Sequence, residues 1–168
     1  MSKFVNICGP VIGTTAYSEN KLVARDVAIT LPEVTPLTAD LAAMGTLSLP
    51  IWALLENMET AVTKIGTDMG LRSLIKPDMK PLEFRWAQTV TDASGNTKNV
   101  GCKAFITGIP NKIPGIGLTT GEASENECTI ATTRYSLFVD GVEMFKIDRL
   151  AGIVRIAGKD YADIDSLL

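Results

Sequence analysis

The chain has 168 residues, of which 46% are hydrophobic and 21% are charged, and its formal net charge is −3. This length can bury a substantial core, so we expect one globular domain over residues 1–168, and the composition excludes a disordered chain. The negative net charge and the lack of any cluster of five or more basic residues argue against sequence-independent binding to DNA.

The chain has three cysteines and no histidine. Cys8, Cys102 and Cys128 are too widely spaced, and odd in number, to indicate a disulfide framework, so free thiols in a reducing compartment are expected. Without histidine or a Cys-x-x-Cys pair, a zinc site is improbable, and Ser-His-Asp or Cys-His catalysis is excluded. We therefore predict no cofactor, no metal and no enzymatic activity.

No segment predicts secretion or membrane insertion. The apolar run at residues 4–12 is broken by Asn6, Gly9 and Pro10, and the longest apolar run, residues 41–55, is too short to span a bilayer. We therefore expect a soluble protein that is made in a cytoplasm.

In chain order, the first predicted element is a strand over residues 23–31, which Pro32 ends. Residues 38–49 contain Gly45 and are consistent with either a short helix or a long loop. From residue 51 to residue 66 the apolar side chains recur at helical spacing, which taken alone predicts an amphipathic helix.

A second helix is predicted over residues 68–76, with Asp68 as the N-cap and Pro77 after its end. The remaining chain alternates between apolar and polar residues and predicts strands. These are a strand around 82–86, a turn at 92–96, strands over 100–109 and 128–139, and a long loop from 110 to 126 between them.

Asp140 and Gly141 lie between two alternating runs. Both residue types tolerate the positive φ of a two-residue type I′ turn, so a β-hairpin is predicted, with one more strand over residues 153–156 that Gly158 ends. The sum is a mainly antiparallel β-sandwich or barrel with one short helix.

The order of these segments resembles the tail tube protein of contractile-tailed bacteriophages and of phage-tail-like (R-type) bacteriocins. The matching positions near the end of the chain are Asp140, Gly141, Glu143, Ile147, Asp148, Val154, Gly158 and Asp160. Residues 27–32, 54–59 and 121–122 also match in order. The resemblance covers roughly residues 22 to 164, and the first twenty residues do not match clearly.

The resemblance implies a structural role. Hexameric rings, to which each copy gives four strands of a 24-stranded barrel, stack into a rigid hollow tube that is driven through the target envelope. The implied partners are further copies, the sheath protein, the baseplate tube initiator and the tail terminator, while DNA (phage) or ions (bacteriocin) pass without specific binding. Assembly would occur in the bacterial host cytoplasm, and the product would be a virion tail or a released tail-like particle.

The resemblance also favours a strand, against the helical periodicity, over residues 51–66. In that register Met58, Thr60 and Val62 face the core, and Glu59, Ala61 and Thr63 face the other way. The expected lumen-facing residues are Glu56, Glu59 and Thr63.

Residues 38–48 match the family's loop that reaches a neighbouring ring. Its expected inter-ring contacts are Leu41, Ala42, Ala43, Met44 and Leu47. An unstructured N-terminal segment, residues 1–20, and an acidic C-terminal tail, residues 160–168, are the other candidates for this contact.

Three alternatives remain open: a soluble β-sandwich binding module, a type VI secretion tube protein, and an enzyme that uses only carboxylates. Other patterns in the sequence are weaker. The glycines at 115–121 do not have dinucleotide-binding spacing, and the acidic residues 160–165 lack the glycine and glutamate of a calcium loop. Trp52 and Trp86 do not lie in a basic cluster that would suggest stacking on nucleic acid.

Overall fold

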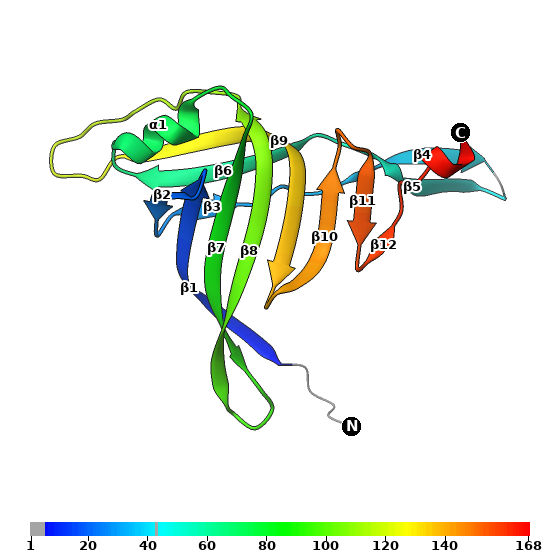
Figure 1. The fold of residues 1–168 in the computed structure, drawn as a ribbon, viewed down its shortest axis with the longest axis horizontal. Coiled ribbons are helices and arrows are strands. Elements are labelled where there is room, and N and C mark those ends of the chain that lie inside the picture. The colour runs from blue at the N-terminus through cyan, green and yellow to red at the C-terminus, as the bar shows by residue number, and fades with distance from the viewer. Residues whose placement is uncertain (1–5, 43) are drawn as a thin grey trace.

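The structure is a computed structural model that describes residues 6–42 and 44–168. It is mainly β, and its described part holds one short α-helix and one C-terminal 3-10 turn (Figure 1). The strands are β1 (Ile7–Ser18), β2 (Lys21–Arg25), β3 (Ala28–Thr30), β4 (Pro36–Ala42), β5 (Thr46–Leu55), β6 (Met58–Ile65), β7 (Lys80–Thr91), β8 (Thr97–Pro110), β9 (Glu125–Val139), β10 (Val142–Asp148), β11 (Ile153–Ile156) and β12 (Lys159–Asp160), and the helices are α1 (Met69–Ile75) and the 3-10 turn η1 (Asp165–Leu167).

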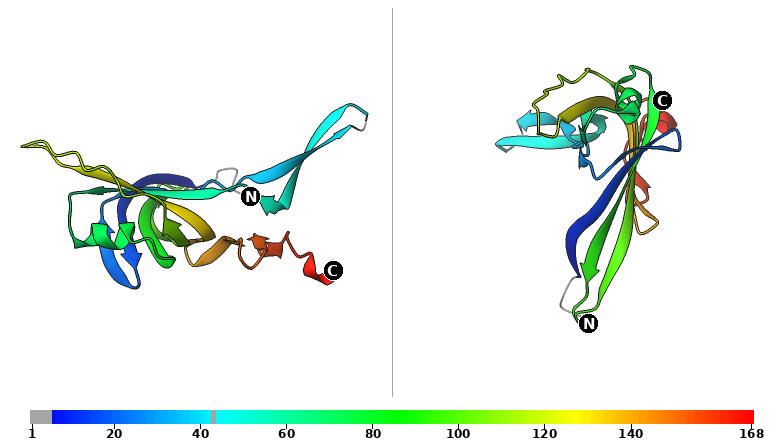
Figure 2. Two further views of the ribbon diagram at one scale, coloured as in Figure 1. Left: turned by 90° about the horizontal axis from the view of Figure 1, so that it is seen from above. Right: turned by 90° about the vertical axis from the view of Figure 1, so that its left-hand side faces the viewer.

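Strand β9 joins two layers of one antiparallel sheet. The larger layer has the order β12-β11-β10-β9-β8-β7-β1-β2, and β6 and β3 extend from β9 as the second layer. Residues 125–132 of β9 pair with β6, and residues 130–139 pair with β8. From Arg134 onward, β10 pairs with β9 on the opposite side from β8. The two layers are seen edge-on in Figure 2, with β9 passing from one to the other.

The main core lies between these layers. Its fully buried side chains include Val62 and Ile130 from the β6–β9 layer and Phe84 and Ile106 from the larger layer. Each such side chain contributes roughly 1.5–3 kcal/mol by leaving water. A second cluster, at the other end of the sheet, contains Leu55, Met58, Ile147, Val154 and Ala162.

Helix α1 covers one end of the main core. Leu71 and Leu74 are buried, and the Asp68 carboxylate accepts from the N–H of Gly70 at 2.8 Å and of Leu71 at 3.3 Å. Gly70 allows the helix to lie directly on β2, because a Cβ there would come within 2.0 Å of the Val23 carbonyl oxygen. The predicted helix and its N-cap are therefore confirmed.

Residues 36–55 form a two-stranded hairpin, so both readings for 38–49, short helix and loop, were wrong. Within the described residues, strands β4 and β5 pair only with each other, and Met44 and Gly45 turn the chain at positive φ. The prolines are tolerated because each strand of such a ribbon has a free edge. The hairpin projects from the body at the end opposite α1 (Figure 2).

The structure resolves the conflict over residues 51–66 in favour of strands. The segment contains the end of β5, the two-residue connection at 56–57, and all of β6. The predicted register is confirmed, because Met58, Thr60 and Val62 are buried while Glu59 is exposed. The strand expected over 23–31 is instead divided at Asp26, whose φ is 53°, so that β2 joins the large layer and β3 joins β6.

The N-terminal segment is not unstructured where the structure describes it, so that expectation was wrong. β1 pairs with β7 from Ile7 to Ser18, and the register shifts between Cys8 and Gly13. Gly9 and Pro10 conceal this strand in the sequence, because both residue types are depleted in strands and Pro donates no ladder hydrogen bond.

The predicted hairpin at Asp140-Gly141 is confirmed. The two residues have φ of 51° and 80°, and Val139 pairs with Val142 across the turn. In the described part of the chain, no helix is long and apolar enough to cross a bilayer.

Candidate functional site

The candidate functional surface is the outward side of β3, β6 and residues 125–131 of β9, here called the acidic face. Glu59 and Thr63 project from β6, and Glu125 and Glu127 project from β9. Thr63 pairs with Glu127 and Ile65 pairs with Glu125, so the side chains from both strands share one side. At the described positions of this side no lysine or arginine projects, since Lys64 points into the core.

Alternation along β6 explains how this side arises. Side chains of successive strand residues point to opposite sides, so the buried set at 58, 60 and 62 leaves Glu59, Ala61 and Thr63 outward. Thr60 and Thr132 hydrogen bond to each other at 2.7 Å beneath the strands, which satisfies both buried hydroxyls. The predicted residues Glu59 and Thr63 therefore lie on one surface.

Glu59 is held by the start of the long loop that joins β8 to β9, residues 111–124. The Asn111 amide donates to the Glu59 carboxylate at 3.1 Å, and the Asn111 N–H donates to the Thr129 carbonyl oxygen at 3.1 Å. The Thr129 hydroxyl in turn donates to the Asn111 side-chain oxygen. These contacts fix the loop to the acidic face at one end, next to Lys112.

Glu56 lies apart from this alternation, in the connection between β5 and β6. Its N–H donates to the Thr35 carbonyl oxygen at 2.8 Å, and its own carbonyl oxygen accepts from the Arg149 guanidinium at 3.4 Å. Its side chain is exposed. The structure therefore brings Glu59 and Thr63 together and leaves Glu56 at the entrance to the strand.

Sequence reasoning missed Glu125 and Glu127. The loop was predicted over residues 110–126 and the strand from residue 128, so Glu125 was assigned to the loop and Glu127 to neither element. The signal that could have found them is the alternation of Glu125 and Glu127 with buried Asn126 and Cys128. That pattern is typical of a strand with one buried and one solvent-exposed side.

The predicted inter-ring residues lie at the tip of the β4–β5 hairpin. Leu41 pairs with Leu47, and both are nearly half exposed, at 47% and 46%. Met44 is fully exposed at the turn, and Ala42 pairs with Thr46. Ala43 lies outside the described residues. The tip is thus an apolar surface that packs against nothing else in the described chain.

The predicted motif residues near the end of the chain are structural. Glu143 and Arg155 form a two-point ion pair, at 2.9 and 3.2 Å, that joins β10 to β11. Ile147 is buried in the second cluster. Gly158 turns the chain at a φ of 83°, and the Asp160 carboxylate accepts from the Ala162 N–H at 2.9 Å.

Asp148 is a buried carboxylate of this motif. One carboxylate oxygen accepts from the Arg134 guanidinium at 2.9 Å, and the other accepts from the N–H groups of Leu150 and Ala151 at 3.1 Å. Burial alone would raise the pKa of this carboxyl, but these donors hold the pKa of Asp148 below its usual value. The Asp148 carboxylate closes the turn between β10 and β11 and needs no catalytic explanation.

The described part of the chain shows no group of side chains that could bind a metal, and its buried thiols are unreactive. Among residues 6–42 and 44–168, no three cysteine or acidic side chains are grouped as metal ligands. Cys102 and Cys128 are buried, and burial raises the pKa of both thiols, so they remain protonated at neutral pH. Burial likewise raises the pKa of Tyr135 to about 12.

Comparison with known proteins agrees with this picture. The family model described as Phage tail tube protein FII matches residues 11–164. The chain belongs to the phage tail tube protein FII family. The resemblance found in the sequence is therefore confirmed, and the role of this tail tube family member is structural.

Solved structures share its fold. One is the sheath–tube complex of an extracellular contractile injection system, PVC, in the extended state, with a TM-score of 0.54, 12% identity, and coverage of 77% of this chain and 90% of that one. Another is the sheath/tube terminator of the same system, with a TM-score of 0.51, 12% identity, and coverage of 82% and 99%. No curated protein matches the chain.

Proposed function

We propose that this chain is the protomer of the inner tube of a contractile tail, and that hexameric rings of it stack into a hollow tube. The observation that carries this proposal is the acidic face together with the backbone edges beside it. A surface whose described strand positions carry carboxylates and no projecting lysine or arginine suits the wall of a channel through which DNA passes, since phosphates would adhere to a basic wall. Glu59, Thr63, Glu125 and Glu127 then line the lumen, with Glu56 at its margin.

Two free edges support ring closure. Pairing between β8 and β9 ends at Pro110 and Ile130, so residues 125–129 have only the Asn111 N–H as a backbone partner on that side within the described chain. β3 pairs with β6, and no strand of residues 6–42 and 44–168 pairs with its other edge. Exposed strand edges readily pair with another chain, and joining two different edges of successive copies closes a ring.

The β4–β5 hairpin supports the stacking of rings. Its apolar tip, whose described residues are Leu41, Ala42, Met44 and Leu47, would be covered by a copy in the next ring. An isolated apolar tip on a projecting hairpin costs solubility, which is offset when a partner covers it. The C-terminal tail, with Leu167 and Leu168 exposed, is a second surface of the same kind.

The partners follow from this arrangement. The solved structures with this fold come from a sheath–tube complex and a tube terminator, so we infer that a sheath surrounds this tube and a terminator ends it. A baseplate initiator would start it, with assembly in the bacterial cytoplasm before the finished particle is released. The acidic channel is compatible with DNA in a phage or ions in a bacteriocin.

Electron cryomicroscopy of the purified full chain tests the proposal. We expect hollow tubes of stacked six-fold rings, with Glu59 and Glu127 resolved on the channel wall. Compact monomers or dimers at high concentration would contradict the tube, and Met58 or Val62 on the channel wall would contradict the register.

A further inference from the structure

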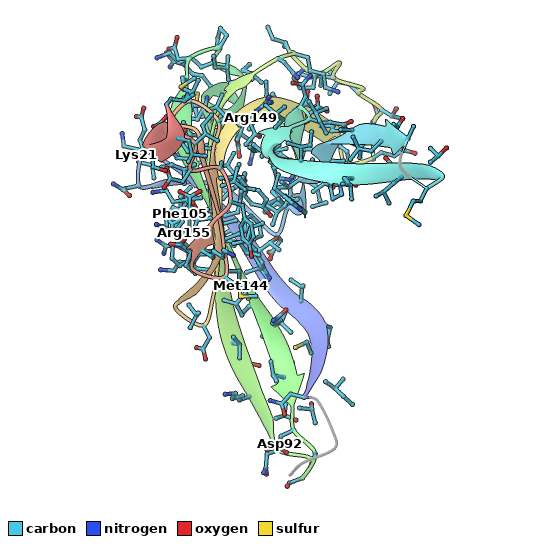
Figure 3. The ribbon with its side chains drawn as sticks, turned by 90° about the vertical axis from the view of Figure 1, so that its right-hand side faces the viewer. Lys21, Asp92, Phe105, Met144, Arg149 and Arg155 are labelled. Carbon is cyan, nitrogen blue, oxygen red and sulfur yellow. The ribbon has the colours of Figure 1, made fainter. Side chains whose placement is uncertain are left out.

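The large layer carries a second exposed surface on the side opposite its core, here called the outer face. Two rows of side chains cross it in register. One row contains Tyr17, Glu83, Phe105, Ser136, Lys146 and Arg155, and the other contains Thr15, Arg85, Lys103, Phe138 and Glu143. Figure 3 shows Phe105 and Arg155 on the side of the sheet turned away from the β4–β5 hairpin.

An aromatic pair lies at the centre of the outer face. The rings of Phe105 and Phe138 meet edge to face with centroids 5.5 Å apart, and Phe105 is 40% exposed. A groove of about 200 Å³, lined in part by Tyr17 and Phe105, opens beside the pair. Exposed aromatic side chains next to a small groove are typical of the central anchor of a protein interface.

Among the described residues, the outer face carries carboxylates that form ion pairs and lysines that do not. Three carboxylates of the face are each neutralised by an arginine: Glu83 by Arg85 at 2.5 Å, Glu143 by Arg155 at 2.9 Å, and Asp148 by Arg134 at 2.9 Å. Asp160 pairs in register with Arg155 at the margin.

Two lysines flank the aromatic pair without such neutralisation. Lys103 pairs in register with Phe138. Lys146 pairs in register with Ser136, and Ser136 pairs on its other side with Phe105. Within the described chain neither lysine takes part in an ion pair. The centre of the outer face is therefore apolar and positively charged, whereas the acidic face on the other side of the molecule has no projecting cation.

We propose that the outer face binds an acidic segment of the sheath protein, with an apolar side chain of that segment against Phe105 and Phe138 and its carboxylates paired with Lys103 and Lys146. The inference rests on the proposed tube, because a lumen-lining acidic face directs the outer face toward the enclosing layer. In the proposed ring, copies joined edge to edge would leave this face uncovered. Two free lysines beside an aromatic anchor match a short acidic peptide segment better than the regular phosphates of DNA, which need many cationic contacts.

Charge reversal of the two lysines tests the proposal. The double variant K103E/K146E of the full chain is assembled into tubes and mixed with the sheath protein of the same particle, and sheath that sediments with the tubes is measured at several salt concentrations. We expect at least about a tenfold loss of sheath binding, because like charges would then face each other across the interface. Binding to wild-type tubes should weaken as salt rises, and the variant should lose most of this dependence.

Two further variants make the result specific. K98E reverses an exposed lysine on the same strand but on the other side by strand alternation, and it should bind sheath like the wild type. Phe105→Ala should weaken binding while keeping the salt dependence of the wild type, since it removes an apolar anchor and no charge.

The outcomes separate the two proposals. Variant tubes of normal diameter that bind no sheath support the docking site. Normal sheath binding to K103E/K146E tubes, equal loss with K98E, or loss of the tubes themselves in K103E/K146E would overturn it. A wild-type chain that forms no tubes would instead contradict the proposed function, and the docking inference with it.

Discussion

The guanidinium of Arg149 donates to the carbonyl oxygen of Leu55 at 3.1 Å, and so joins the turn after β10 to the end of β5. The same group reaches the Glu56 carbonyl oxygen and the Asn57 side chain, each at 3.4 Å. The Arg149 N–H donates to the Thr133 carbonyl oxygen at 3.0 Å, at the place where β9 leaves one layer for the other. One side chain therefore fixes the root of the projecting hairpin to the large layer (Figure 3).

Removing this side chain should loosen the hairpin more than it weakens the fold. We expect Arg149→Ala to lower the free energy of unfolding by about 1 kcal/mol, because its hydrogen bonds are charge-assisted but partly exposed to water. Amide hydrogen exchange at residues 55–58 should speed up, while exchange in the core of β8 stays unchanged. Lys98→Ala, which removes an exposed side chain elsewhere, is the control, and equal exchange in both variants would argue against the link.

The buried Asp148 carboxylate gives the protein an acid-sensitive element. Its folded-state pKa lies below the unfolded value, so its stabilisation is complete above the unfolded pKa of about 3.9 and is lost as pH falls through the lower folded-state pKa. In urea denaturation, the stability difference between the wild type and Asp148→Asn should be constant from about pH 5 to 7 and shrink below about pH 4. A difference that stays constant into acid would show that the charge does not stabilise the fold.

Gly108 is required where β8 meets β9 at a shift of register. A Cβ at this position would lie 2.3 Å from the Ala131 carbonyl oxygen and 2.8 Å from a methyl carbon of Ile130. We expect Gly108→Ala to cost about 1–3 kcal/mol of unfolding free energy by overpacking. Gly101→Ala, on the same strand with open space around its Cβ, should change the stability by less than about 1 kcal/mol. Similar melting temperatures for the two variants would contradict this contact.

Charges at the hairpin tip should block the stacking of rings. Leu41 and Leu47 are about half exposed in the isolated copy, so Leu41→Asp and Leu47→Asp should leave its thermal melting within a few degrees of the wild type. Negative-stain microscopy should then show single rings or short stacks in place of long tubes. Long tubes from both variants would place the inter-ring contact elsewhere.

Reversing charge on the acidic face should make the channel adhere to DNA. We expect Glu59→Lys combined with Glu127→Lys to form tubes that retain DNA in a filter-binding assay, with an affinity that falls steeply as salt rises. Asp163→Lys, an exposed change near the C-terminus, should not do so. Equal retention by both would mean that the acidic face does not line the channel.

The sequence predicts those elements whose stabilising contacts are local, and it misses those that depend on contacts with distant segments. The Asp140-Gly141 hairpin and the Asp68 cap were predictable because their chemistry is local: a turn needs positive φ, and a helix start needs an acceptor. β1 was missed because Gly9 and Pro10 lie in a strand whose register shifts there, and only pairing with distant β7 keeps it extended.

The helical spacing of residues 51–66 misled for a different reason. Leu54 and Ile65, which complete that pattern, are more than half exposed, at 53% and 59%. They are apolar on the outward side of two separate strands, so periodicity mixed core residues with surface residues. The resemblance to a known family predicted strands here, whereas the spacing of apolar residues predicted a helix. The spacing argument assumes that every apolar side chain is buried within its own chain, and that assumption fails for these two residues.

The acidic face was predicted only in part. Glu59 and Thr63 followed from the strand register of β6, but Glu127 required the pairing of β6 with β9, two segments that are far apart in sequence. Of the residues predicted for inter-ring contact, Leu41, Met44 and Leu47 are exposed at the hairpin tip, although the strands of the hairpin were not recognised.

The path of β9 through both layers has a mechanical consequence. When a tube is pushed against a cell envelope, the load on its inner wall must reach the outer wall without the two sliding past each other. In the proposed tube this load would cross along covalent peptide bonds, because one continuous strand is paired with β6 at its start and with β8 and β10 at its end. Shear between the walls would have to break the backbone hydrogen bonds of β9 with β6, β8 and β10 at the same time. The protomer would therefore resist this shear as one rigid unit.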